Sequence, residues 1–510
     1  MVKNVVTNAW RFDQFFGHTG FMLPFIRKVK TNSGATAVQI IHKQGRRVER
    51  IDHIGSAHGD TELKALIACA KEKIHEGQLA LAILEDDEAD IYLEHAYSKL
   101  LWDSLAFVYT RLGFGMLGDD TFRQLVLARI IEPTSKLDTI RVLDELGLAV
   151  PSNTSVHRCL RKVITEDYRS TISTACFRST TPKALSLVLY DVTTLYFEIQ
   201  KEDGYRKPGM SKERRLEPQI TVGLLVDRDG FPLEVASFEG NRAEVKTIIP
   251  VLEAFRARHK ISDITVTADA AMLSSENVSA LEDLGYNYIV GSRLTKFPYE
   301  IERYLRLPGA ELVDGQIFES RARVTVAGKR TYRRCIYQYR AKRAALDLSN
   351  IDKTLAKAQR MVAGTAEIKR NRFLKLTGAT KEINEELVAS ARMRAGFKGY
   401  VTNLKAPAAE IIGSYHQLFQ VERSFRMSKS DLKARPIFHH LRDSIEAHLT
   451  VVFAALAICR YIEAKTHITI KRFVRKLAPV RTGVISINGA KQTIKARVPE
   501  DVTELLLLLD

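Results

Sequence analysis

Residues 184–198, ALSLVLYDVTTLYFE, form a β-rich run in which apolar residues surround one carboxylate, Asp191. The runs QITVGLLVD (219–227) and PLEVASFEG (232–240) follow, separated by the turn RDG, and predict two more strands of a meander. Helix-, strand-, helix- and strand-like segments come next, at 244–259, 264–272, 274–285 and 286–292. This alternation predicts a mixed α/β layer.

Length and composition limit the class of protein. The chain has 510 residues, more than one core usually organises, so we expect several domains. Apolar residues make up 45% and charged residues 27% of it, which excludes a disordered, collagen-like or disulfide-stapled chain. The five cysteines are scattered without a CxxC pair, so a zinc finger is not expected.

The longest nearly apolar run, Leu449–Cys459, is about half the ~20 residues that span a bilayer, and no secretory signal is visible. We therefore expect a cytoplasmic protein with no membrane partner.

The charge balance favours a polyanionic partner. Lys and Arg number 77 against 60 Asp and Glu, a net charge of +17. Between Arg321 and Tyr400 there are 20 basic and 6 acidic residues, a local net charge of +14. Because each neutralised phosphate releases counterions, nucleic acid is the favoured partner.

The region before the α/β layer predicts two modules. Residues 1–115 mix short strand-like runs with helical periodicity at 62–83. Residues 119–165 predict a helical module whose last helix Thr154 or Ser155 would cap. The helix lengths fit a helix-turn-helix DNA reader as well as a plain helical subdomain, and the sequence leaves both open.

Two acids occur where buried strands should be. Asp191 lies inside an apolar strand-like run, where a carboxylate is costly unless a metal, a charge or water compensates it. Asp269 follows ITVTA, where a strand should end; in isolation it is more simply a turn or N-cap residue. Acids on neighbouring strand ends are the usual beginning of a Mg²⁺ site, because Mg²⁺ prefers hard oxygen ligands.

A third acid lies in the segment SYHQLFQVERSFRMSKSDLKAR, 414–435, which we expect to form one helix. At ~100° per residue, five of its positions fall in one stripe of about 80°. They are Tyr415, Leu418, Glu422, Arg426 and Lys429. A Tyr, a Glu and two cations on one face suit a metal ligand flanked by phosphate-binding groups. A solvated charged face is the alternative.

These residues together resemble a known family. Tyr415, Glu422 and Lys429 have the Y-x(2)-R-x(3)-E-x(6)-K spacing of DDE insertion-sequence transposases. Asp191 in YDVTT and Asp269 in TADAAM are similar to the first and second acids of that family. The segments 128–137, 208–244 and 433–458 are similar to its long-insertion subgroup. The position of the signature Arg is Leu418, and Arg426 or Arg423 is the expected substitute.

The resemblance implies an α/β fold with a ribonuclease-H-like mixed sheet flanked by helices, interrupted by a basic insertion domain, with N-terminal and helical DNA-binding modules. The implied boundaries are 1–115 for an N-terminal α+β domain, 116–180 for the helical module, 181–296 and 399–465 for the catalytic domain, 297–398 for the insertion domain and 466–510 for a tail.

The resemblance also implies an activity and partners. Asp191, Asp269 and Glu422 would be both the catalytic residues and the ligands of two Mg²⁺ ions, with Mn²⁺ possible in their place. The enzyme would cut the ends of an insertion sequence and join the freed 3′-OH to target DNA. Its partners would be the terminal inverted repeats, target DNA and a second copy of the chain, in the bacterial cytoplasm at the nucleoid.

Several side chains are candidates for DNA contacts, most of them cations, because dense Lys and Arg position the phosphate backbone. They lie on the signature helix, in the loop after the first strand and in the insertion: Tyr415, Arg426 and Lys429, then Lys212 and Arg215, then Arg333, Arg334, Lys342 and Arg343. His439 and His440 are adjacent and do not share a helix face, so a metal site is not expected there.

Two rival functions stay open. The chain could be a non-catalytic DNA-binding protein derived from a transposase, which loss of an acid would indicate. It could also be a structure-selective nuclease that cuts without joining.

Overall fold

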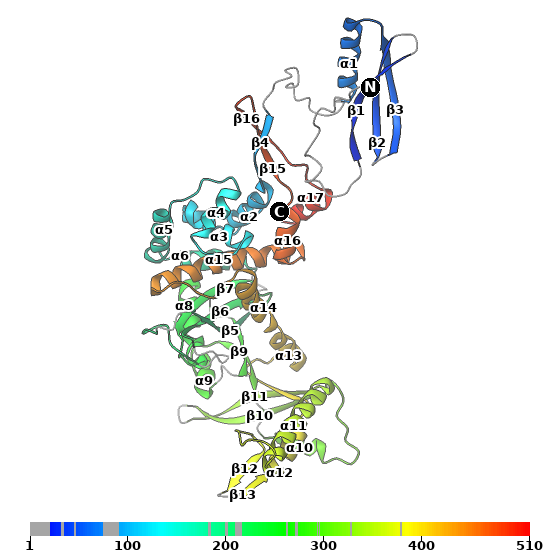
Figure 1. Cartoon of the computed structure of the whole chain (residues 1–510). Helices are drawn as coiled ribbons and strands as arrows, with labels where there is room; N and C mark the ends of the chain where they lie inside the picture. The colour runs from blue at the N-terminus through cyan, green and yellow to red at the C-terminus, as the bar shows by residue number, and fades with distance from the viewer. Residues whose placement is uncertain are drawn as a thin grey trace. The chain divides into compact units, whose positions relative to one another are not determined.

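The computed structural model divides the chain into two compact units (Figure 1). The first comprises Met1–Tyr92 and Ser486–Lys491, and the second Leu93–Ile485 and Gln492–Asp510. The structure describes residues 21–31, 35–44, 47–74, 91–181, 185–198, 202–209, 217–261, 264–270, 274–292, 294, 296–326, 329–377 and 380–509. The finer domain boundaries stay a prediction.

The N-terminal unit contains a three-stranded antiparallel sheet and a helix. Its elements are β1 (Phe21–Lys30), β2 (Thr36–Gln44), β3 (Arg47–Ala57) and α1 (Asp60–Ile74), with strand order β1-β2-β3. Val38 and Ile40 of β2 pack with Ala70 of α1 in a small core. The strands and the helix agree with the predicted mixture, although residues 75–83 of the expected helix lie outside the described residues.

The second unit begins with a helical layer. It comprises α2 (Lys99–Arg111), α3 (Asp120–Ile131), α4 (Asp138–Glu145), α5 (Asn153–Thr165) and α6 (Tyr168–Ser179). The prediction that Thr154 or Ser155 caps the helix at 153 is wrong: Ser152 is the N-cap, and its hydroxyl accepts from the Ser155 backbone N–H. Ser152 has the extended backbone that an N-cap needs, whereas Thr154 and Ser155 are already helical.

An eight-stranded mixed sheet forms the centre of the second unit, in the order β10-β11-β14-β9-β8-β5-β6-β7. The strands are β5 (Leu187–Tyr196), β6 (Gln219–Asp227), β7 (Pro232–Glu239), β8 (Thr265–Ala268), β9 (Asn287–Ser292), β10 (Ile317–Val326), β11 (Lys329–Tyr339) and β14 (Phe397–Thr402). The predicted strands at 184–198, 219–240, 264–272 and 286–292 are confirmed. The basic region does not stand apart from the sheet, because β10, β11 and β14 extend it past β9.

Each face of the sheet has its own core. On one face, Val188 and Tyr190 of β5 pack with α8 (Ile248–His259) and α9 (Ser275–Asp283). On the other, Leu189 and Leu195 pack with α13 (Ala408–His416), α14 (Phe419–Arg426) and α15 (Arg442–Thr466). The alternation follows from the period of two along a strand.

Helix α15 is a core helix. It is long and apolar enough by length and composition to cross a membrane, yet 89% of its most apolar window is buried inside the protein. It runs beneath the helical layer and across the sheet region (Figure 1) and contacts α3, α5 and β7. Its apolar residues are therefore explained by packing between the two layers.

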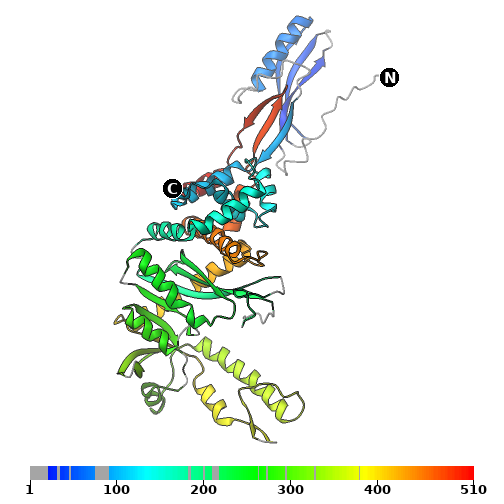
Figure 2. The same ribbon diagram turned by 90° about the vertical axis from the view of Figure 1, so that its left-hand side faces the viewer.

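The remaining elements complete the second half of the chain. The basic region adds α10 (Tyr299–Leu305), α11 (Ala341–Val362), β12 (Leu374–Thr377), β13 (Thr380–Ile383) and α12 (Glu385–Met393). Figure 2 shows α11 and α12 as neighbouring helices, joined through Ile351, Ala358 and Val388. The other elements are β4 (Ile91–Tyr97), α16 (Ile470–Leu477), β15 (Thr482–Ile487), β16 (Ala490–Ile494) and α17 (Glu500–Leu507).

Candidate active site

The register of the central strands brings Asp191 and Asp269 to the same level. β5 and β8 are parallel, and Leu189 opposite Thr267 is the last pair of their register; Asp191 lies two residues further along β5, and Asp269 follows the last residue of β8. Both are an even number of residues from that pair, so both point to the face that α13, α14 and α15 cover. Carboxylates so far apart in the sequence therefore become neighbours on one sheet face.

Asp269 is held by a buried tyrosine. The Tyr415 hydroxyl donates to Asp269 Oδ1 at 2.9 Å, and the Ala270 backbone N–H donates to the same oxygen at 2.7 Å. Tyr415 is 4% exposed, and its burial, followed by the Asp269 charge, raises the pKa of its hydroxyl. The hydroxyl therefore stays protonated and acts as a donor to the carboxylate.

Gly291 makes room for this tyrosine. It follows Val290, which pairs with Ala268, so it lies beside Asp269 on β9. A Cβ built on Gly291 would lie 2.5 Å from the Tyr415 hydroxyl oxygen. Any side chain at this position would displace the hydroxyl from the carboxylate.

Lys398 interacts electrostatically with both Asp269 and Glu422. It lies on β14, and its Nζ is 4.3 Å from the centre of the Tyr415 ring. Burial lowers the pKa of Lys398 and so does Arg343, while Asp269 and Glu422 oppose the shift. Sequence reasoning missed Lys398 and Gly291; the only sequence signals are a strand-end glycine in YNYIVGS and one lysine among many in the basic region.

The segment that carries Glu422 is not one helix, so the prediction of a continuous helix across 414–435 is wrong. α13 ends at His416, α14 starts at Phe419, and a π-helical turn follows at Met427–Asp431. The first break has tighter i→i+3 bonds, from Gln417 to Ser414 and from Leu418 to Tyr415, and the π turn has wider hydrogen-bond rings than an α-helix. Each break therefore changes the angular phase of the residues that follow. The five predicted residues therefore do not form one stripe: Tyr415 is buried, whereas Glu422 and Arg426 are exposed.

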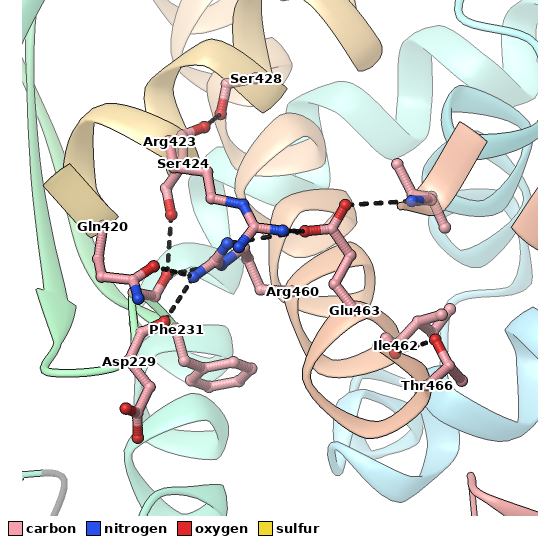
Figure 3. Close-up of polar contacts among 12 residues, drawn as sticks. Asp229, Phe231, Gln420, Arg423, Ser424, Ser428, Arg460, Ile462, Glu463 and Thr466 are labelled. Atoms are coloured by element: carbon pink, nitrogen blue, oxygen red, sulfur yellow. Dashed lines mark hydrogen bonds and ion pairs between the residues drawn. The ribbon is translucent and has the colours of Figure 1, made fainter. Parts of the chain in front are cut away.

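A buried polar network anchors α14 (Figure 3). Its Ser424 hydroxyl donates to the Gly230 carbonyl at 2.8 Å, and Arg423 pairs with Glu463 at 2.7 Å. Arg460 of α15 donates to the Gly230 carbonyl at 3.1 Å and to Gln420 Oε1 at 3.0 Å. With Val421 and Phe425 in the core, these bonds fix α14 over β5 and β6. Arg423 is thus committed to Glu463.

Glu422, the third predicted acid, is exposed on α14, on the same side of the sheet as Asp191 and Asp269. Among the described residues, no three Asp, Glu, His or Cys side chains are close enough together to hold a metal ion. The two aspartates carry the carboxylate oxygens that Mg²⁺ prefers as ligands.

A basic cleft opens next to Asp269. Its volume is about 690 Å³, and Asp269, Gly291 and Tyr415 form part of its wall. The basic region supplies four cations to the same cleft, Arg343, Arg372, Arg394 and Lys398, and one acid, Asp347, which lies 3.5 Å from Arg343. Arg372 and Arg394 were not singled out from the sequence, where they are two of many basic residues. A polyanion lying in this cleft would pass directly beside Asp269.

The other predicted DNA contacts differ in their surroundings. Lys342 and Arg426 are exposed, and Lys429 is half-buried beside Thr193. Arg333 is 6% exposed and forms a bidentate pair with Glu282, and Arg334 pairs with Glu319, so neither presents an uncommitted guanidinium. Lys212 and Arg215 lie outside the described residues.

Comparison with known proteins identifies the family. The family model described as a transposase DDE domain matches residues 182–458. No curated protein matches the chain. Among solved structures, the cryo-EM structure of a piggyBac transposase synaptic complex with hairpin DNA is similar, with a TM-score of 0.39 and 10% identity over 75% of this chain and 79% of that one. Because the matched residues are more than half of the chain and include Asp191, Asp269 and Glu422, the protein belongs to the family of transposases with a DDE domain.

Proposed function

We propose that the protein is a DNA transposase that cuts the ends of an insertion sequence and joins the freed 3′-OH to target DNA. The observation that supports the proposal is the parallel register of β5 and β8, whose last pair, Leu189 and Thr267, lies two residues before Asp191 and Asp269, on the sheet face covered by the helix that bears Glu422. The strand order β7-β6-β5-β8-β9 supports a ribonuclease-H-like catalytic sheet, extended by the strands of the basic region.

The reaction needs two exchanges at phosphorus. In cutting, a water oxygen bonds to phosphorus, the bond from phosphorus to the 3′-oxygen breaks, and the 3′-oxygen takes up a proton. In joining, that 3′-OH attacks a target phosphodiester, and the target's own 3′-oxygen leaves. The protein's part is to position the strand, and the cleft cations Arg343, Arg372, Arg394 and Lys398 are placed to bind its phosphates beside Asp269.

Asp191, Asp269 and Glu422 would hold two Mg²⁺ ions, or Mn²⁺ in their place. Bound metal would lower the pKa of the attacking hydroxyl or water and stabilise charge on the leaving oxygen. Tyr415 orients the Asp269 carboxylate through its hydrogen bond, and Lys398 offsets the negative charge of Asp269 and Glu422. Arg426, Lys429 and Lys342 are further candidates for phosphate contacts.

The expected partners follow from this reaction. They are the terminal inverted repeats of the element, target DNA and a second copy of the chain that bridges the two ends. The net charge of +17 supports a polyanionic partner. The place of action would be the bacterial cytoplasm, at the nucleoid.

Three substitutions test the proposal: Asp191→Asn, Asp269→Asn and Glu422→Gln. Each should abolish Mg²⁺-dependent cutting of an end-containing duplex, while DNA binding and thermal unfolding stay unchanged. Asp283→Asn on α9 and Glu253→Gln on α8 are matched controls, because both acids are exposed on helices of the opposite sheet face and should cut normally. Normal cutting by any of the three variants removes that residue from the catalytic set.

One observation favours a second function, a DNA-binding protein without catalysis. Glu422 is exposed, and no three-residue metal cluster occurs in the described part of the chain. A wild-type chain that binds DNA but shows no cutting in Mg²⁺ or Mn²⁺ would support this alternative. A chain that cuts but transfers no strand into a plasmid would instead be a structure-selective nuclease.

A further inference from the structure

A second basic pocket lies away from the carboxylates, between the helical layer and the loop that follows α14. Its volume is about 620 Å³, and its wall is formed by α3, the α3–α4 connection, α5, the loop 433–439 and α15. Four cations and three histidines line it, and no Asp or Glu does. The side chains that line the pocket thus bring positive charge together without a carboxylate among them.

Arg129 is the deepest cation of this pocket. It is 7% exposed, and within the described residues its guanidinium has no hydrogen-bond or ion-pair partner. A guanidinium on a pocket wall without a protein partner leaves its five N–H donors to water or to a ligand. The side chain therefore carries unused donors into a space large enough for a ligand.

Lys136 and two histidines surround the same space. Lys136 Nζ contacts His439 Nε2, and the His439 and His448 rings are 5.8 Å apart. His448 Nε2 is bonded to the Ala434 carbonyl, while its buried Nδ1 has no partner within the described residues. Burial, and then the charge of Arg129, lowers the pKa of Lys136 to about 7. An anion in the pocket would remove this mutual repulsion and engage the unused donors.

The loop that forms part of the pocket wall connects the pocket to the catalytic sheet, where DNA would lie. The Ile437 backbone N–H donates to the Tyr196 carbonyl, so the loop 433–439 runs beside the end of β5. Tyr196 is five residues beyond Asp191 on that strand, about 17 Å at about 3.3–3.4 Å per residue. This is about half a turn of duplex DNA. Leu137 and Phe438, 63% and 60% exposed, form an apolar rim suited to the sugar that carries a phosphate.

We propose that this pocket binds a backbone phosphate of the DNA that the catalytic face holds, through Arg129 and Lys136. The proposal rests on the proposed function only in taking DNA, rather than free phosphate, as the source of the anion. It assigns a role to the 433–439 loop, whose adjacent histidines have no place in the catalytic set.

The test measures binding of a short random-sequence duplex to the full chain by fluorescence anisotropy, without Mg²⁺, across about 50 to 200 mM salt. Arg129→Met and Lys136→Gln should each weaken binding several-fold and reduce the slope of log affinity against log salt by about one. Lys136→Gln is the variant that keeps the test valid if Arg129→Met does not fold, because Lys136 is only half-buried. Lys246→Gln is the matched control, an exposed cation just before α8 and outside the pocket wall, and should leave the slope unchanged.

Inorganic phosphate is the second probe, titrated calorimetrically at constant ionic strength. Weak binding that Lys136→Gln abolishes supports an anion pocket. The proposal is overturned if both pocket variants keep the wild-type salt slope, or if Lys246→Gln lowers it equally. If phosphate binding depends on Lys136 but the duplex slope does not, DNA is excluded as the source. The assay needs no cutting, so normal cutting by Asp191→Asn would reject the proposed function and leave this result standing.

Discussion

Two buried arginines of the same unit, Arg460 and Arg129, have opposite surroundings. Arg460, 5% exposed, bonds to the Gly230 and Asp229 carbonyls and to Gln420, and lies 3.7 Å from Glu463 (Figure 3). Arg129, 7% exposed, has none of these partners within the described residues and faces a pocket. The same residue type therefore serves the fold in one region and remains available to a ligand in the other.

This difference distinguishes a buried cation that stabilises the fold from one that can bind a ligand. A buried cation whose donors are all used holds elements together, here α14 against the β6–β7 turn. A buried cation whose donors are unused costs stability until something binds it, and proteins retain such groups at functional sites. The partners of a buried charge are thus more informative than its burial.

The largest expected effect is the difference in unfolding free energy between the Arg460→Met and Arg129→Met variants. Arg460→Met breaks a buried pair and leaves two carbonyls and Glu463 short of donors, so it should lower the free energy of unfolding by about 3–5 kcal/mol. Arg129→Met removes an unpaired charge and should change it by less than about 1 kcal/mol. Urea unfolding measures both. Equal losses would show that the two arginines are equally structural.

The next effect concerns pH and Lys136. Its folded pKa of about 7 lies below the usual lysine value of 10.5, so between these values the unfolded chain binds more protons and stability rises with pH. We expect the unfolding midpoint of the wild type to rise from pH 7 to pH 9 relative to that of Lys136→Met. Thermal unfolding across this range checks it, and parallel curves for the two proteins would contradict the lowered pKa.

A smaller effect should follow from filling the space beside Asp269. Gly291→Ala places a methyl group 2.5 Å from the Tyr415 hydroxyl oxygen, and overpacking of this kind costs about 1–3 kcal/mol. It should also slow cutting, because Tyr415 could no longer orient Asp269. Gly413→Ala is the matched control, since a Cβ there meets nothing within 4 Å and Ala favours the helix. Unfolding and cutting assays on both variants distinguish crowding at the site from a general effect of Gly→Ala.

The smallest effect should come from Arg423→Gln. Its side chain is 47% exposed, so its bond to Glu463 resembles a surface pair and should contribute less than about 1 kcal/mol. Urea unfolding measures this loss beside that of Arg460→Met. A loss as large as that of Arg460 would mean that Glu463 depends on both arginines equally.

The strands and the two aspartates were accessible from the sequence because local pattern encodes them. Alternating and continuous apolar runs gave β5 to β9, and Asp191 stood out as a carboxylate within such a run. The segment 414–435 was predicted less well. Its charged stripe assumed an unbroken α-helix, and neither the break after His416 nor the π turn at Met427–Asp431 has a proline or glycine to announce it.

The sequence also could not show which cations of the basic region are paired with acids and which line the cleft. Charge density predicted the basic region, yet it could not separate Arg333, which Glu282 holds, from Arg343 and Lys398, which line the cleft beside Asp269. Arg129 and Lys136 were not singled out at all, because the loop 433–439 that encloses them lies about 300 residues away along the chain.

The sequence by itself determined the order of strands and helices, the three acids and the excess of positive charge, because these depend on local periodicity and composition. Only the tertiary structure decided which acids are neighbours, which cations are neutralised and where a pocket is left open. Those outcomes depend on strand register and on contacts between distant segments, and no local pattern records them.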